Sequence, residues 1–214
     1  MSVSYVKDVC NTFRDYSKLP KVILDKIIEN NDSIFKLLTL SNPTIIEYED
    51  LETNEHIPEM QIDGKNLTKE EKRDLVYRGG NYSDEYRIQL QKSTDDALQD
   101  TQCRLHIYIH SIIPYTAYDG IINIAFQVIC HNKFNMINDG ERSRVDCVTE
   151  ELMNFLIGLE LDLDGVHGGI MFDYRESEGK NQLKNDISNI KNLFGNTLIL
   201  SVRYSQKEDK GFYR

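Results

Sequence analysis

The chain has 214 residues, of which 25 are lysine or arginine and 35 are aspartate or glutamate, so its formal net charge at pH 7 is −10. This length suits one domain with a sizeable hydrophobic core, or one domain with an added arm. The acidic balance argues against a protein that grips nucleic acid by neutralising phosphates, because that mode needs clustered lysine and arginine. No continuous apolar run could span a bilayer, and no signal-peptide layout opens the sequence, so we expect a soluble protein of intracellular origin with no membrane partner.

The first part of the chain predicts a helical arm. Pro20 is tolerated at the start of a helix, and apolar residues recur at helical spacing after it. A further apolar stretch contains Ile34, Phe35 and Leu38. Residues 1–43 are therefore interpreted as an N-terminal helical arm, which is too apolar to stand alone and must pack on another surface.

Residues 44–100 predict a peripheral region of loop with one short helix. The segment 47–59 is acidic and irregular, and only 67–77 carries a faint helical stripe. Tyr86–Gln91 alternates weakly between apolar and polar residues, which is a poor strand signal.

The strongest pattern is a strand, a polar turn and a helix between Ile121 and Leu159. Alternate residues of Ile121–His131 are apolar, which predicts a half-buried strand with one polar face. Ser143, with Asp146 three residues later, predicts the N-cap of a helix. The apolar stripe of that helix ends at Gly158, which favours a left-handed C-terminal cap there.

Three other segments predict strands. Arg104–Ile112 alternates well and should pair with Ile121–His131 as an antiparallel hairpin with a long loop. Ile170–Arg175 and Thr197–Tyr204 carry the same period-2 pattern. All of these strands need the central helix to cover their apolar face.

The order of the elements predicts the fold class. A core at residues 101–205 would be interrupted by a polar excursion at 176–196, with a helix over 183–194, and followed by a charged tail at 206–214. Strands followed by a helix and further strands are typical of the α+β class. We therefore expect an antiparallel or mixed β-sheet covered on one face by a central helix, with the N-terminal helical arm attached.

A calcium-loop pattern begins at Glu160, with carboxylates at alternate positions and a glycine sixth. The twelfth position, which needs a bidentate glutamate, is Met171, and the eighth, usually aliphatic, is His167. The stretch is therefore interpreted as an exposed acidic turn without a metal.

Histidines and cysteines cluster around two predicted strands, which raises the question of zinc. Strand alternation places His106 and His110 opposite the face of Cys103, and Cys130 opposite His131. Because these side chains diverge, we expect no metal site. His106 and His110 are instead predicted to be exposed residues of a polar face or of an interface. The four cysteines of the chain have no Cys-x-x-Cys spacing, which predicts free thiols.

Motifs for nucleotide binding or for a nucleophilic serine are absent, so no cofactor is expected. Distant carboxylates can still assemble an active site. A metal-dependent nucleic-acid-processing enzyme using Asp162, Asp164 and Asp173 therefore stays open as an alternative, as does a binding module, although solvated loop charges explain these residues more simply.

Two arginines precede the apolar stripe of the central helix. Arg142 and Arg144 oppose the positive end of the helix dipole and gain nothing locally from it. Carboxylates of a neighbouring subunit would compensate for this position. Local bonds to Asp139, Glu141 or Asp146 explain the arginines equally well.

Three short motifs occur in a characteristic order: Arg144-Val-Asp146 at a helix start, Leu156-Ile-Gly158 at its end, and Phe194-Gly195 before the last strand. This order resembles the tail-terminator and neck (head–tail connector) proteins of tailed bacteriophages. The Asn-rich, apolar segment 27–43 is also similar to the first helical segment of some neck proteins. The resemblance covers roughly residues 104–204 and part of the arm.

The resemblance implies a structural virion protein that is not an enzyme. Such a protein is assembled in the cytoplasm of the host bacterium and closes into a homo-oligomeric ring, six- or twelvefold, between the portal or connector and the tail tube. DNA would pass through the lumen without specific binding, and a charge of −10 per subunit would repel it. The residues expected at the intersubunit interface are Ile34, Phe35, Leu38, His106, His110, Arg142 and Arg144.

Overall fold

The computed structural model describes residues 16–39, 61–62, 65–66, 68–77, 86–92, 102–115, 119–137, 140–163, 166–171 and 192–206. The helices are η1 (Tyr16–Lys18), α2 (Leu19–Asn30), α3 (Asp32–Thr39), α4 (Lys69–Val76), α5 (Asn132–Asn135) and α6 (Arg144–Leu156). The strands are β1 (Gln61–Ile62), β2 (Lys65–Asn66), β3 (Ile88–Gln89), β4 (Cys103–Pro114), β5 (Asp119–His131), β6 (Met136–Ile137), β7 (Arg142–Ser143), β8 (Glu160–Leu163), β9 (Val166–Met171) and β10 (Leu193–Gln206).

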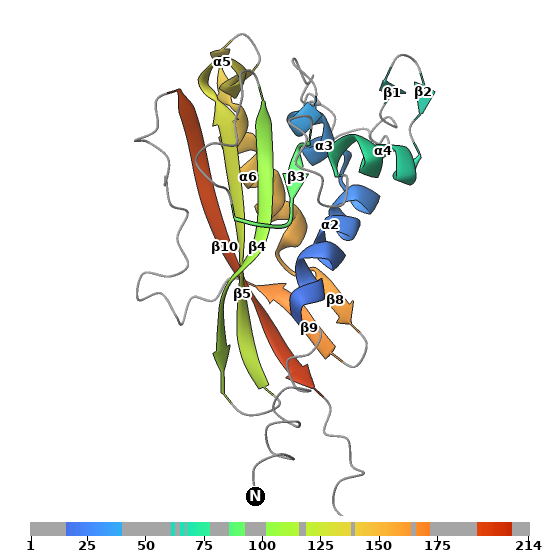
Figure 1. The fold of residues 1–214 in the computed structure, drawn as a ribbon, viewed down its shortest axis with the longest axis vertical. Coiled ribbons are helices and arrows are strands. Elements are labelled where there is room, and N and C mark those ends of the chain that lie inside the picture. Colours follow the sequence, from blue (N-terminus) through green and yellow to red (C-terminus); the bar gives the residue numbers. More distant parts are fainter. Residues whose placement is uncertain are drawn as a thin grey trace, which may run out of the picture.

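One mixed sheet dominates the fold, with the strand order β3-β4-β5-β10-β9-β8. Its body consists of β4, β5 and β10, which are 12, 13 and 14 residues long and run along the long axis of the molecule (Figure 1). The β3–β4 pair is parallel, and the other pairs are antiparallel. The three flanking strands, β3 on one side and β9 with β8 on the other, are much shorter than the central ones. Long stretches of β4 and β10 therefore have no neighbour among the described strands on their outer sides.

Helices α2, α3 and α6 contact one face of the sheet, which we call the helix face, and α4 packs on α2 and α3 (Figure 1). Apolar side chains fill the space between these helices and the sheet. Their burial removes this area from water and supplies the main stabilisation of the fold. The largest fully buried apolar residues are Leu19, Ile23, Leu24, Ile27, Ile34, Leu38, Leu105, Ile107, Ile122 and Phe126.

The predicted fold class is confirmed, because the structure is α+β with a mixed sheet covered by helices on one face. The boundaries of α6 are also confirmed. The Ser143 side chain accepts a hydrogen bond of 3.4 Å from the backbone N–H of Asp146. Gly158 has a φ of +84°, the left-handed conformation in which a side chain is strained.

The N-terminal helices are confirmed as helices, and they pack on the sheet and on α6 of their own chain, as their apolar character requires. Ile34, Phe35 and Leu38 of α3 are buried on the helix face of the same chain. The short helix expected within 67–77 is α4, which begins with a capping box formed by Thr68 and Glu71.

The prediction that β5 is half-buried was wrong. Every residue from Ile122 to His131 is buried, including the polar side chains that alternate with the apolar ones. Alternation reports which side chains share a face, and it does not report how far either face is exposed to solvent.

Three other predictions require correction. Glu160–Leu163 was expected to be an exposed acidic turn, but it is β8, paired antiparallel with β9. Strand β9 begins at Val166 rather than at Ile170, because its residues from Val166 to Gly169 pair with β8. The helix expected over 183–194 does not reach its predicted end, since Leu193 and Phe194 already belong to β10. Residues 172–191, with most of the excursion, lie outside the described residues.

Candidate functional site

Arg144 is the first residue of α6 and is completely buried. Its Nε donates a hydrogen bond of 2.8 Å to the carbonyl oxygen of Phe134, and a second guanidinium nitrogen donates to the carbonyl oxygen of Leu37. The guanidinium carbon also lies 3.8 Å from the centroid of the Phe134 ring, which is a cation–π contact. A single side chain therefore joins α3, α5 and α6.

The position of Leu37 explains why a cation is tolerated there. Leu37 lies in the last turn of α3, where the carbonyl groups have no partner within the helix and carry partial negative charge. Arg144 thus satisfies an acceptor that would otherwise be buried without a donor. Burial lowers the pKa of Arg144 from its ordinary value, and the neighbouring thiols of Cys103, Cys130 and Cys147 oppose that shift.

The two arginines that the sequence pairs have different environments. Arg142 is half exposed and donates a hydrogen bond of 2.9 Å to the carboxylate of Glu150, an exposed residue of α6. Glu150 is not among the local partners expected from the sequence, which were Asp139, Glu141 and Asp146. Arg144 was predicted to be a surface or interface residue, and its burial corrects that prediction.

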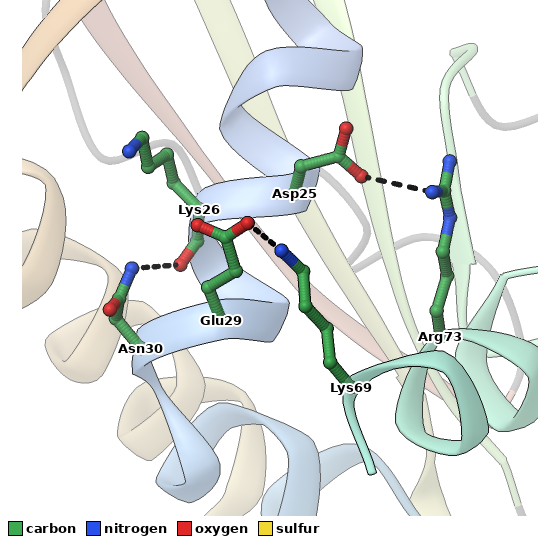
Figure 2. Close-up of polar contacts among 6 residues, drawn as sticks. All are labelled: Asp25, Lys26, Glu29, Asn30, Lys69 and Arg73. Atoms are coloured by element: carbon green, nitrogen blue, oxygen red, sulfur yellow. Dashed lines mark hydrogen bonds and ion pairs between the residues drawn. The ribbon is translucent and has the colours of Figure 1, made fainter.

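Ion pairs fasten α4 to the N-terminal helices (Figure 2). Lys69 pairs with Glu29, and Arg73 lies 3.6 Å from the carboxylate of Asp25. Lys72 makes a similar contact with Asp32 at the start of α3. These exposed or half-exposed pairs each contribute little, but together they hold α4 over the outer side of α2.

The opposite face of the sheet carries buried polar residues, and we call it the polar face. The apolar residues Ala125, Ile129 and Ile199 are buried on this face as well. Its buried polar residues are Arg104, His106, Asn123, Gln127, His131, Thr197 and Ser201.

The side chain of Asn123 forms hydrogen bonds with its neighbours on both adjacent strands. Its amide nitrogen donates to Ser111 Oγ at 2.9 Å, and its Oδ1 accepts from Ser201 Oγ at 2.7 Å. These three residues occupy one row across β4, β5 and β10. The row links the three central strands through side chains as well as through the backbone.

His106, Gln127 and Thr197 form a second polar row on the same three strands. The row of Tyr108, Ala125 and Ile199 separates it from the first. His106 Nδ1 lies 3.0 Å from the carbonyl oxygen of Gln91, so Nδ1 carries the proton and Nε2 is an acceptor. Both His106 Nε2 and Thr197 Oγ1 are buried without a hydrogen-bond partner. Burial lowers the pKa of His106 to about 4, and Arg104 adds to this effect, whereas the bond to Gln91 opposes it.

His106 was predicted to be exposed, and it is buried instead. His110 is exposed as predicted, and it is the additional residue of a β-bulge in β4, since Ile109 pairs with Ile124 and Ser111 with Asn123. The bulge turns His110 out of the alternation on which the sequence prediction depended.

No group of three or more His, Cys, Asp or Glu side chains within the described residues is arranged to hold a metal ion. Of the carboxylates considered for a nuclease, Asp162 belongs to β8, and Asp164 and Asp173 lie outside the described residues. Among the helices that the structure describes, none is long and apolar enough to cross a membrane.

Comparisons of the chain with protein-family models, with curated proteins and with solved structures found no match.

Replacing Arg144 by alanine should lower the free energy of unfolding by about 3 kcal/mol, because the carbonyl groups of Leu37 and Phe134 lose charge-assisted donors and a cavity remains. Urea unfolding measures the change. Arg142→Ala, which removes an exposed pair, should change it by less than about 1 kcal/mol. Equal effects of the two substitutions would contradict the role assigned to Arg144.

His106 should make stability depend on pH. The pKa of His106 is about 4 in the folded chain, whereas the ordinary value of 6.5 applies to the unfolded chain. Between these two pH values the unfolded chain therefore binds more protons than the folded chain. Stability should therefore fall as the pH drops from about 6.5 to 4, by roughly 3 kcal/mol in total. His106→Gln should flatten this part of the profile, whereas His110→Gln should leave it unchanged. Parallel profiles for wild type and His106→Gln would refute the assignment.

The two polar rows predict opposite effects of removing a hydroxyl. Thr197→Val should leave stability unchanged or raise it by up to about 1 kcal/mol, because Oγ1 has no partner to lose. Ser201→Ala should lower stability by about 1 kcal/mol, because Asn123 Oδ1 loses a donor. Thermal unfolding of both variants provides the comparison, and a marked loss in Thr197→Val would indicate a bound polar partner at that hydroxyl.

Proposed function

We propose that the chain is a structural subunit of the neck of a tailed bacteriophage, a connector or tail terminator that forms a homo-oligomeric ring between the portal side and the tail tube. In this role the protein acts by assembly and not by catalysis. The sequence resemblance motivates the proposal, and the arrangement of strand edges in the sheet supports it.

The supporting observation is that the sheet has two long edges without a described neighbour. Strand β3 pairs with β4 at Leu105 and His106, and from Ile109 to Pro114 the outer side of β4 faces no described strand. Strand β9 pairs with β10 from Ser201 onward, which leaves Leu193–Leu200 without a described neighbour on that side. A strand edge of this kind is a template for pairing with another chain.

In the strand order, the two edges without a described neighbour belong to opposite sides of the three central strands, β4 on one side and β10 on the other. The part of β10 without a described neighbour lies toward one end of the long strands, and that of β4 toward the other end (Figure 1). Pairing the β4 edge of one subunit with the β10 edge of the next is a head-to-tail contact between two different surfaces. Such a contact, repeated from subunit to subunit, gives a ring when the rotation between neighbours closes a full turn and an open filament otherwise. A pairing of two different edges therefore supports the proposed ring over a two-fold dimer, in which both subunits use the same surface.

We therefore place the proposed intersubunit interface at the edges of β4 and β10 and not at the N-terminal helices. Ile34, Phe35 and Leu38 are buried in the core of their own subunit and are not offered to a neighbour. The exposed His110 lies at the open part of β4, and Phe194, with 48% of its surface exposed, lies at the open part of β10. These two residues are the best positions at which to test the contact.

Lysine at either open edge should prevent assembly, because a charged side chain there disfavours strand pairing. Light scattering after size exclusion should give a ring for the wild type and monomers for His110→Lys and for Phe194→Lys. An equal mixture of the two variants should give dimers, because one unaltered β4 edge still meets one unaltered β10 edge.

Asn154→Lys, on the exposed side of α6, is the matched control and should assemble like the wild type. Thermal unfolding of each variant separates loss of assembly from loss of folding. A wild-type chain that stays monomeric at every soluble concentration and cleaves DNA when Mg²⁺ is added would contradict the proposal and favour the enzyme alternative.

A further inference from the structure

Two cysteines face each other across the central hairpin. Cys103, the first residue of β4, and Cys130, the penultimate residue of β5, are direct partners in the antiparallel register. Both are buried free thiols. Cys147 is also a buried free thiol, but it lies on α6 and is not part of this cross-strand pair.

The hydrogen-bond pattern fixes the type of this pair. The backbone N–H of His131 donates to the carbonyl oxygen of Gln102 at 3.0 Å, and these two residues are the next opposed positions along the ladder. Hydrogen-bonded and non-hydrogen-bonded positions alternate in antiparallel strands. Cys103 and Cys130 therefore occupy a non-hydrogen-bonded position, where the side chains approach most closely.

This position is within reach of a disulfide. Opposed Cα atoms at non-hydrogen-bonded positions are about 4.5 Å apart, and a disulfide accepts Cα separations from about 4.4 Å. We propose that Cys103 and Cys130 form a modification site, a dithiol that closes reversibly to a cross-strand disulfide with a small disulfide, such as oxidised glutathione, as the oxidant.

The reaction is a pair of exchange steps. The thiolate of one cysteine attacks a sulfur of oxidised glutathione, forming a mixed disulfide and releasing one glutathione thiolate. The second cysteine then attacks the mixed disulfide and releases the second glutathione. The protein loses two protons and two electrons, and oxidised glutathione becomes two molecules of glutathione.

The surroundings of the pair decide when the exchange occurs. The guanidinium of Arg144 favours the thiolate of Cys130, whereas the hydrogen bond with Cys103 and burial both raise the pKa of Cys130. The thiol of Cys130 therefore stays protonated in the folded structure. The pair lies next to the Gln102–His131 bond at the end of the hairpin, so local fraying of that end is sufficient to admit the oxidant.

The test uses the full chain with Cys10→Ser and Cys147→Ser, which leaves only the proposed pair. The protein is refolded in glutathione buffers ranging from fully reduced to fully oxidised, which gives the thiols access during folding. In the oxidised buffer, intact mass should fall by two hydrogens, and proteolysis should yield a peptide that links Cys103 to Cys130. Far-UV circular dichroism should stay native, and Tm should rise by about 5–10 °C.

Reduction with dithiothreitol should restore both thiols and the original Tm. The unsubstituted chain provides a second test that needs no variant to fold, because peptide mapping identifies which of its four cysteines pair. Persistent free thiols in the oxidised buffer, an oxidised chain without native secondary structure, or a disulfide that involves Cys10 or Cys147 would each overturn the proposal.

Discussion

The burial of one guanidinium group constrains the rest of the fold. Arg144 lies where α6 begins, and its hydrogen bonds reach the carbonyl groups of Leu37 and Phe134. A buried cation is stable only when such acceptors are held in place. The N-terminal helices must therefore stay on the sheet, and the chain between β5 and α6 must follow its observed path. The consequence is a subunit whose helical layer is tied to its sheet by polar contacts as well as apolar ones.

The two faces of the sheet stabilise the fold in different ways. The helix face supplies the hydrophobic core, whereas the polar face joins β4, β5 and β10 through rows of side chains such as Ser111, Asn123 and Ser201. Hydrogen bonds of this kind specify register, because a shift of one residue would bury donors and acceptors without partners. A fixed register also fixes the position of the strand edges at which the proposed ring would close.

Local signals were sufficient to predict much of this fold. The Ser143 cap and Gly158 mark the ends of α6 because capping chemistry acts over one turn of helix. The burial of Arg144 and His106 could not be predicted, since their partners, Leu37 and Gln91, are distant in sequence. The bulge at His110 and the strand from Glu160 were missed for the same reason, because both depend on pairing with another strand.

Hydrogen exchange of backbone amides can detect the proposed head-to-tail pairing of the β4 and β10 edges. The exchange of the assembled wild-type chain is compared with that of a monomeric edge variant. The account predicts added protection in two segments together, Ile109–Pro114 of β4 and Leu193–Leu200 of β10, with little change in α6. Protection confined to one of these segments, or to the outer helices α2 and α4, would contradict it.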